Sequence, residues 1–179
     1  MTDSRADKPE KDTLTVMLPL TGFTDRATAN LIRTVYARQD LIAAMAQSDR
    51  IRIDTETMIR LDHEMPVSAK WIARIVAEET AQGRVSGVRL EGGEFGLTFE
   101  YETSEQARAY TDLTALIVAH VRTAQYVRST RMTPGRNHMK YACSEWLKWL
   151  GMTPSACHED REALLRHIPN SRTSKDDKQ

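Results

Sequence analysis

The sequence predicts an α+β fold in which a small three-stranded sheet packs against about five helices. Alternating apolar residues over 14–18 predict a half-buried strand, which Pro19 ends. Two further alternating runs, 85–90 and 95–101, flank the dipeptide Gly92-Gly93. Because glycine accepts a positive φ angle, this arrangement predicts a tight hairpin. The N-terminal strand and the hairpin together form the expected sheet.

Helices are expected where apolar residues recur three and four positions apart. The first begins at a capping residue, Thr24 or Asp25, and ends near Ser48. A second runs from Val67 to Gly83, a typical C-terminal glycine. The intervening segment, Ile51 to Met65, fits either an edge strand or one or two helical turns.

The C-terminal half is predicted to be helical. A long helix is expected from the cap at Thr103 or Ser104 to about Arg131. The pairs Thr133-Pro134 and Thr153-Pro154 each combine a cap with a first-turn proline, which predicts two more helices. The ranges 1–12 and 170–179 are predicted to be disordered tails around a single domain, 13–169.

The composition favours a globular cytoplasmic protein. The chain has 25 basic and 25 acidic residues, so only local segregation of charge can attract a charged partner. The two cysteines are too few for a disulfide framework. The charged residues of 1–12 argue against a signal peptide, and the longest uncharged apolar run, 113–121, is too short to span a membrane.

No pattern of a catalytic or metal site is found, and we expect neither an enzyme nor a cofactor. Thiols and imidazoles gather near the C-terminus, at Cys143, Cys157, His138, His158 and His167. No Cys-x-x-Cys pair occurs, and Cys143 shares an apolar helical stripe with Met139, Trp146 and Leu150, which favours a structural role. The pair His63-Glu64 is interpreted as a solvated polar loop.

Charge segregation is the strongest functional signal. Between residues 122 and 148 the chain has six bases and one acid, and between 100 and 112 it has four acids and one base. The candidate partner or nucleic-acid-binding residues are Arg122, Arg128, Arg131, Arg136, His138, Lys140 and Lys148. The candidate acidic partner face comprises Glu100, Glu102, Glu105 and Asp112.

These charges admit two interpretations. A basic junction between two helices would hold phosphates or an acidic partner, and the nearby Tyr126 and Tyr141 would stack on bases. The simpler alternative is a solvated surface, whose polarity partly complements the helix dipole. Trp149 and Tyr101 lie off the apolar stripes, so a homodimer contact is a further option.

Six stretches resemble a prophage-encoded family known as "virulence-related protein". The similarity covers most of 14–171 in matching order, and the stretches that show it are LPLTGFT (18–24), NLI (30–32), ARQDLI (37–42), AYTDLTAL (109–116), NHMKYACSEWLKWLGM (137–152) and REALL (161–165). That family ends in an aromatic residue and an arginine after Asn-Ser. This chain has Asn170-Ser171-Arg172-Thr173, without the aromatic.

The resemblance implies a phage or mobile-element accessory protein that binds and inhibits a host defence component in the bacterial cytoplasm. The family is also similar to a group of small type II anti-CRISPR proteins, so the Cas9–guide ribonucleoprotein is the first expected partner. The alternative function is a nucleic-acid-binding accessory protein of phage recombination or regulation. No membrane partner is expected.

Overall fold

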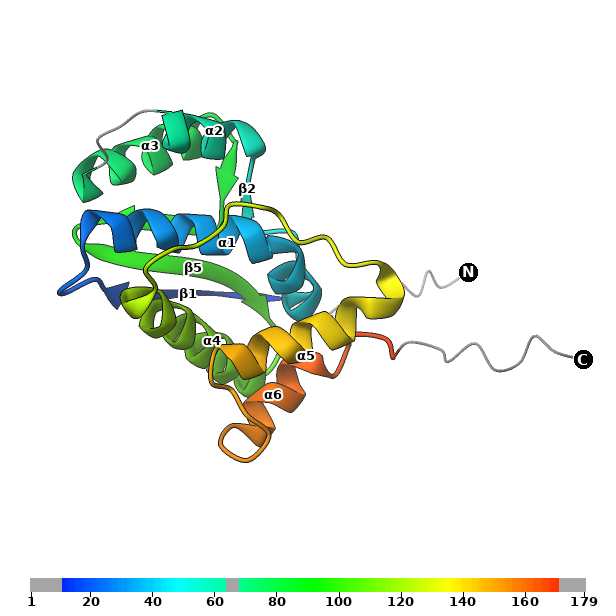
Figure 1. The fold of residues 1–179 in the computed structure, drawn as a ribbon. Helices are drawn as coiled ribbons and strands as arrows, with labels where there is room; N and C mark the ends of the chain where they lie inside the picture. The colour runs from blue at the N-terminus through cyan, green and yellow to red at the C-terminus, as the bar shows by residue number, and fades with distance from the viewer. Residues whose placement is uncertain (1–10, 64–67, 171–179) are drawn as a thin grey trace, which may run out of the picture.

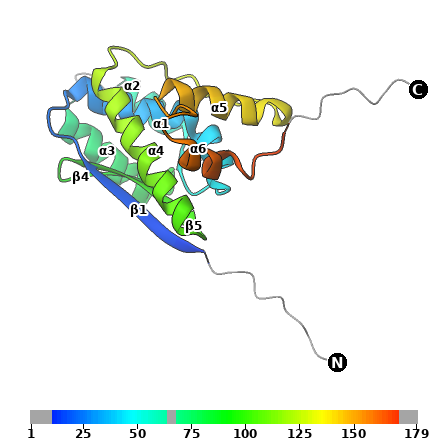
Figure 2. The same ribbon diagram turned by 90° about the horizontal axis from the view of Figure 1, so that it is seen from below.

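The computed structural model describes residues 11–63 and 68–170. It is an α+β fold, as predicted, in which helices cover one face of a three-stranded antiparallel sheet (Figures 1 and 2). The strands of this sheet are β1 (Asp12–Pro19), β4 (Val88–Glu91) and β5 (Glu94–Tyr101). Their order is β1-β5-β4, so the first strand pairs with the second arm of the hairpin. Gly92 and Gly93 both have positive φ angles, which confirms the hairpin turn.

The run predicted as one strand over 85–90 is divided at Gly87. Its first part, β3 (Val85–Ser86), pairs with β2 (Arg52–Ile53) in a separate two-stranded sheet. Gly87 has a φ of 65°, and a Cβ atom built there would lie 2.6 Å from the carbonyl oxygen of Arg50. Only glycine fits this bend, because it has neither the steric penalty at positive φ nor a side chain.

Helix α1 (Asp25–Ala46) is the centre of the molecule (Figure 1). Thr24 is its N-cap, as predicted, and its side chain accepts a hydrogen bond from the backbone N–H of Ala27. The helix ends at Gln47, whose φ is 50°. Residues on almost all of its sides are buried, among them the polar Asn30, Thr34 and Gln39.

Two short helices follow α1. For the segment from Ile51 to Met65, the sequence left an edge strand and one or two helical turns as alternatives. The structure has both, first strand β2 and then helix α2 (Thr55–His63). Helix α3 (Ala69–Ala81) begins at the N-cap Ser68. The start predicted at Val67 and the second residue of the pair His63-Glu64 lie outside the described residues, and His63 itself ends α2.

The long helix α4 (Ser104–Thr123) is shorter than predicted. Thr103 and Gln106 form the capping box at its start, but the helix ends at Thr123 and not near Arg131. Ala124 has an extended ψ of 122°, and its carbonyl oxygen accepts a hydrogen bond from the side chain of Asn30. Residues 124–135 form an irregular connecting segment that crosses α1 (Figure 1).

The last two helices also begin later than predicted. Helix α5 (Met139–Trp149) follows a 3-10 turn, η1 (Arg136–His138), because Gly135 has an extended ψ of 154° and prevents a helical turn at Thr133-Pro134. Helix α6 (His158–Leu165) begins four residues after Pro154. Cys157, with φ −138° and ψ 47°, separates the turn at 153–156 from this helix.

The core is continuous between the sheet and the helices. Phe95, Leu97 and Phe99 of β5 point into it, and Phe99 stacks on Tyr110 of α4 with 4.5 Å between the ring centroids. The predicted stripe of α5 is buried at Cys143 and Trp146. Among residues 11–63 and 68–170, no helix is both long and apolar enough to cross a membrane.

A buried carboxylate of α3 links this helix to α2 and to Arg84, the residue before β3. Glu79 of α3 is 1% exposed and accepts hydrogen bonds from Thr57 at 3.0 Å, Arg60 at 2.9 Å and Arg84 at 2.5 Å. The hydrogen bond from Arg84 is the main cause that lowers the pKa of Glu79 to about 2, against the opposing effect of burial. A buried charge of this kind is tolerated only when it is paired.

Replacing this carboxylate is expected to destabilise the fold in a pH-dependent way. The variant Glu79→Gln should lose about 2–4 kcal/mol of unfolding free energy at pH 7, measured by urea denaturation. The pKa is lowered on folding, so the stabilisation exists above pH 4.5 and is lost as the pH falls towards 2. The control Glu78→Gln, on the half-exposed neighbour, should cost less than about 1 kcal/mol. Equal losses in both variants would contradict the assignment.

Candidate binding surface

The structure does not gather all the predicted basic residues into one junction. Arg122 lies over the ring of Phe23, 5.4 Å from its centroid. Arg131 pairs with Asp40 of α1 at 2.5 Å, and Lys148 pairs with Glu145 on its own helix at 2.6 Å. These three cations therefore already have partners within the fold.

Four of the predicted residues form no ion pair with any described residue, namely Arg128, Arg136, His138 and Lys140. Arg128 is exposed on the connecting segment, and Arg136 and His138 are exposed in η1. Lys140 lines a hollow of about 350 Å³ between α5 and α6, together with His158, Arg161 and Arg166. These four residues lie on the connecting segment, η1 and the start of α5, so they do not gather at a junction between α4 and α5 as predicted.

The predicted acidic face is largely neutralised by neighbouring bases. Three of its carboxylates form ion pairs at 3.4 Å: Glu100 with Arg50, Glu102 with Lys11, and Glu105 with Arg166. For the fourth, Asp112, burial and a hydrogen bond shared with Asp160 raise the pKa above its usual value. Little free negative charge therefore remains at the start of α4.

A different surface stands out in the fold. Five large apolar side chains are substantially exposed in the described part of the chain, and three of them are aromatic. Four of the five belong to the connecting segment and the outer face of α5: Tyr126 (78% exposed), Met132 (40%), Tyr141 (70%) and Trp149 (56%). We call these four residues, with Arg38 of α1, the aromatic surface.

The connecting segment reaches this position because α1 holds it at three points. The side chain of Asn30 donates to the carbonyl of Ala124 at 3.3 Å, and the N–H of Met132 donates to the carbonyl of Ala37 at 2.9 Å. The third point is the ion pair of Asp40 with Arg131. Burial of Asp40 opposes its ionisation, but hydrogen bonds from Arg131 and Thr133 keep its pKa below the usual value.

Two neighbouring hollows of about 430 and 660 Å³ lie in the aromatic surface. Arg38, Met132 and Trp149 line both of them. Tyr126 and Arg128 line the smaller hollow, and Tyr141 and Lys148 line the larger. Side chains from α1, α5 and the connecting segment therefore meet around a single arginine.

Arg38 is a half-buried cation without a carboxylate partner among the described residues. Its guanidinium donates to the sulfur of Met132 at 2.9 Å, a weak acceptor. Burial lowers the pKa of Arg38, yet an arginine stays charged at neutral pH. The group can still donate to a carboxylate or a phosphate of a partner.

Trp149 is held in place by His120 of α4. The two rings are in tilted contact, with 3.7 Å between their centroids and a 43° angle between their planes. Burial lowers the pKa of His120 below its usual value, so the imidazole is neutral at pH 7. The contact with His120 therefore orients the indole from within the fold, while more than half of the Trp149 surface stays exposed to a partner.

The predicted structural role of Cys143 is confirmed. Its side chain is fully buried, its sulfur lies 3.8 Å from the carbonyl oxygen of Leu41, and burial raises the pKa of the thiol to about 12. A thiol of this kind stays protonated and is a poor nucleophile or metal ligand. Among the described residues, no three His, Cys, Asp or Glu side chains are grouped to hold a metal ion.

Sequence reasoning finds only part of this surface. Trp149 stands out in the sequence because it lies off the apolar stripe of α5, and both tyrosines lie beside the basic residues. Arg38 and Met132 are missed, because their proximity depends on the irregular course of the connecting segment, most of which the sequence predicts as helix.

Comparisons with known proteins identify no relative of this chain. No protein-family model matches the chain, and no match was found among curated proteins or solved structures.

Proposed function

We propose that this chain is a non-enzymatic binding protein that docks on a macromolecular partner through the aromatic surface. The partner proposed first is a host defence component, namely the Cas9–guide complex, whose nuclease the chain would inhibit. The setting would be a phage or mobile element acting in the bacterial cytoplasm.

The observation that supports binding is the group of Tyr126, Tyr141 and Trp149 around Arg38, a cation that no carboxylate of the described residues pairs with. Tryptophan, tyrosine and arginine are the residues that contribute most of the energy at protein interfaces. Large exposed apolar side chains that gather in one place on a monomer mark an interaction site. Here they line hollows, which a side chain of a partner can fill.

The structure favours a different mode of partner recognition from the acidic face and basic junction expected from the sequence. Of the four residues of the candidate acidic face, Glu100, Glu102 and Glu105 form ion pairs, and the pKa of Asp112 is raised, so this face is a poor mimic of a nucleic-acid backbone. The aromatic surface instead combines apolar area with a cation, which suits a protein surface that presents a carboxylate beside apolar residues. The choice of Cas9 rests on the resemblance of the six sequence stretches to the prophage family.

The direct test is co-purification with a Cas9–guide complex and a target-cleavage assay. We expect co-elution and reduced cleavage at excess protein, and we expect Trp149→Ala to weaken binding by about 2 kcal/mol or more, some thirtyfold. The matched control is Ile59→Ala, which removes an exposed apolar side chain (51%) from α2, away from this surface.

The outcomes test the choice of partner and the choice of binding surface separately. If the chain neither co-elutes with the complex nor changes cleavage, Cas9 is not its target. If it binds but Trp149→Ala and Ile59→Ala behave alike, the aromatic surface is not the interface.

A second candidate function is nucleic-acid binding. It is favoured by the exposed Tyr126, which lines a hollow together with Arg128. Arg128 and Arg136 are both exposed, and neither forms an ion pair within the described residues. Aromatic rings that stack on bases, next to arginines that contact phosphates, are the usual elements of single-strand recognition.

This second function predicts salt-dependent binding of single-stranded DNA or RNA. The triple variant R128E/R136E/K140E should abolish it, and each lost phosphate contact should reduce the slope of log K against log salt by about 0.7. The control is Arg26→Glu, a charge reversal on an exposed residue at the start of α1 that lines neither hollow. Absence of binding at low salt, or equal loss in the control, would exclude this function.

A further inference from the structure

Strand β4 leaves one backbone edge open. It pairs only with β5, and it is the last strand of the sheet. Backbone groups of an antiparallel strand point alternately to its two sides. The carbonyl of Gly87 accepts from Thr98 of β5, so the N–H and C=O groups of Val88 and Leu90 point to the other side. No strand in the described residues pairs with them there.

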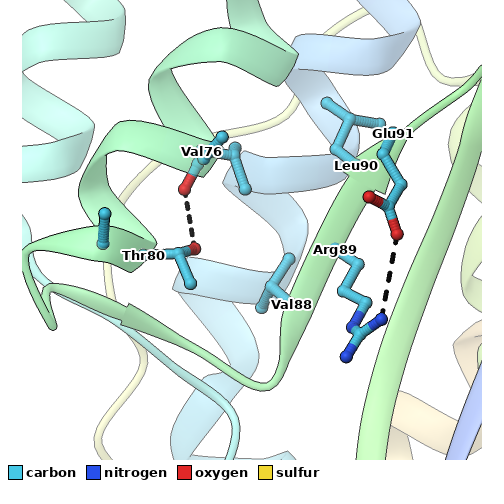
Figure 3. Close-up of a pocket in the computed structure, with 8 residues that line it drawn as sticks. Val76, Thr80, Val88, Arg89, Leu90 and Glu91 are labelled. Carbon is cyan, nitrogen blue, oxygen red and sulfur yellow. Dashed lines mark hydrogen bonds and ion pairs between the residues drawn. The ribbon is translucent and has the colours of Figure 1, made fainter.

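A hollow of about 390 Å³ lies along this edge, between β4 and α3 (Figure 3). Val76 and Thr80 of α3 line one side, and Val88 and Leu90 of β4 line the other. The outer residues of α3 at the hollow are small, namely Ala77 and Ala81, and both are exposed. Nothing bulky on the helix therefore blocks the edge.

The exposed side chains of β4 carry opposite charges two positions apart. Arg89 and Glu91 lie on the open face of the sheet, 3.8 Å from each other, with Leu90 between them (Figure 3). If two such strands pair in antiparallel orientation with Leu90 opposite Leu90, then Arg89 of each copy faces Glu91 of the other. The edge is thus complementary to itself.

We propose that β4 is the interface of a homodimer, formed by antiparallel pairing of β4 with β4 of a second copy about a two-fold axis at Leu90. The outward N–H of Leu90 in each copy donates to the outward C=O of Leu90 in the other copy, because residues opposite each other on such edges form a hydrogen-bonded pair. The two sheets become one continuous sheet of six strands.

The helices fit this arrangement. Paired strands lie about 4.8 Å apart, and helices pack at about 8–10 Å. Two copies of α3 then meet over the new strand pair, with Ala77 and Ala81 in contact and the hollow filled. A symmetric dimer of this kind is the commonest form of oligomer, and it uses the same patch on both copies.

This proposal is independent of the proposed function. The aromatic surface involves α1, α5 and the connecting segment, and it shares no residue with β4 or α3. The dimer would present two copies of that surface.

The test is a set of charge reversals measured by analytical ultracentrifugation. The wild-type chain should sediment as a concentration-dependent dimer. Arg89→Glu places two like-charged pairs in the interface, and so does Glu91→Arg, and each should weaken the dimer about tenfold or more. Both residues are exposed, so the fold should be retained, which circular dichroism checks.

A mixture of the two variants gives the decisive result. In a heterodimer, positions 89 and 91 are both acidic in the Arg89→Glu copy and both basic in the Glu91→Arg copy, so opposite charges face each other at both contacts. Dimerisation should therefore return when the variants are mixed, and also in the double variant R89E/E91R. The control Trp149→Ala should leave the dimer unchanged.

Three results would overturn the proposal. One is a wild-type chain that stays monomeric up to high concentration, which would leave the edge to a strand of another protein. Another is a dimer that survives both single reversals. The third is a dimer lost in the single variants that does not return on mixing.

Discussion

The burial of helix α1 on nearly all sides is the constraint on which the rest of the structure depends. A buried helix must find partners for its polar side chains, and three side chains of α1 find them in other parts of the chain. Gln39 bonds both backbone groups of Ile53 and so fixes β2. Asn30 bonds Ala124, at the start of the connecting segment, and Asp40 bonds Arg131, further along it.

This arrangement explains why the exposed aromatic residues gather in one place. The connecting segment has no regular structure of its own, so its course follows the hydrogen bonds that α1 offers. It brings Tyr126 and Met132 next to Trp149, which His120 already orients. The polar groups that satisfy the core thus also build the surface that we assign to a partner, and a change in α1 would alter both.

The sequence correctly predicted the features that depend on residues close together in the chain. The caps Thr24 and Thr103, the hairpin at Gly92-Gly93 and the apolar stripes all formed as expected, because each is a local signal. The errors concern contacts distant in sequence. The end of α4 depends on Asn30, which lies 94 residues away, and the pairing of Arg131 depends on Asp40. The sequence showed segregated charges but gave no sign of the carboxylates that neutralise them.

The attachment of the connecting segment to α1 can be measured directly by amide hydrogen exchange. The N–H groups of 125–131 donate to no backbone acceptor within the described residues, whereas the N–H of Met132 donates to the carbonyl of Ala37. The structure therefore predicts one strongly protected amide, at Met132, beyond a run of rapidly exchanging ones. If Met132 exchanges as fast as its neighbours, the segment is not held on α1, and the aromatic surface does not exist as described.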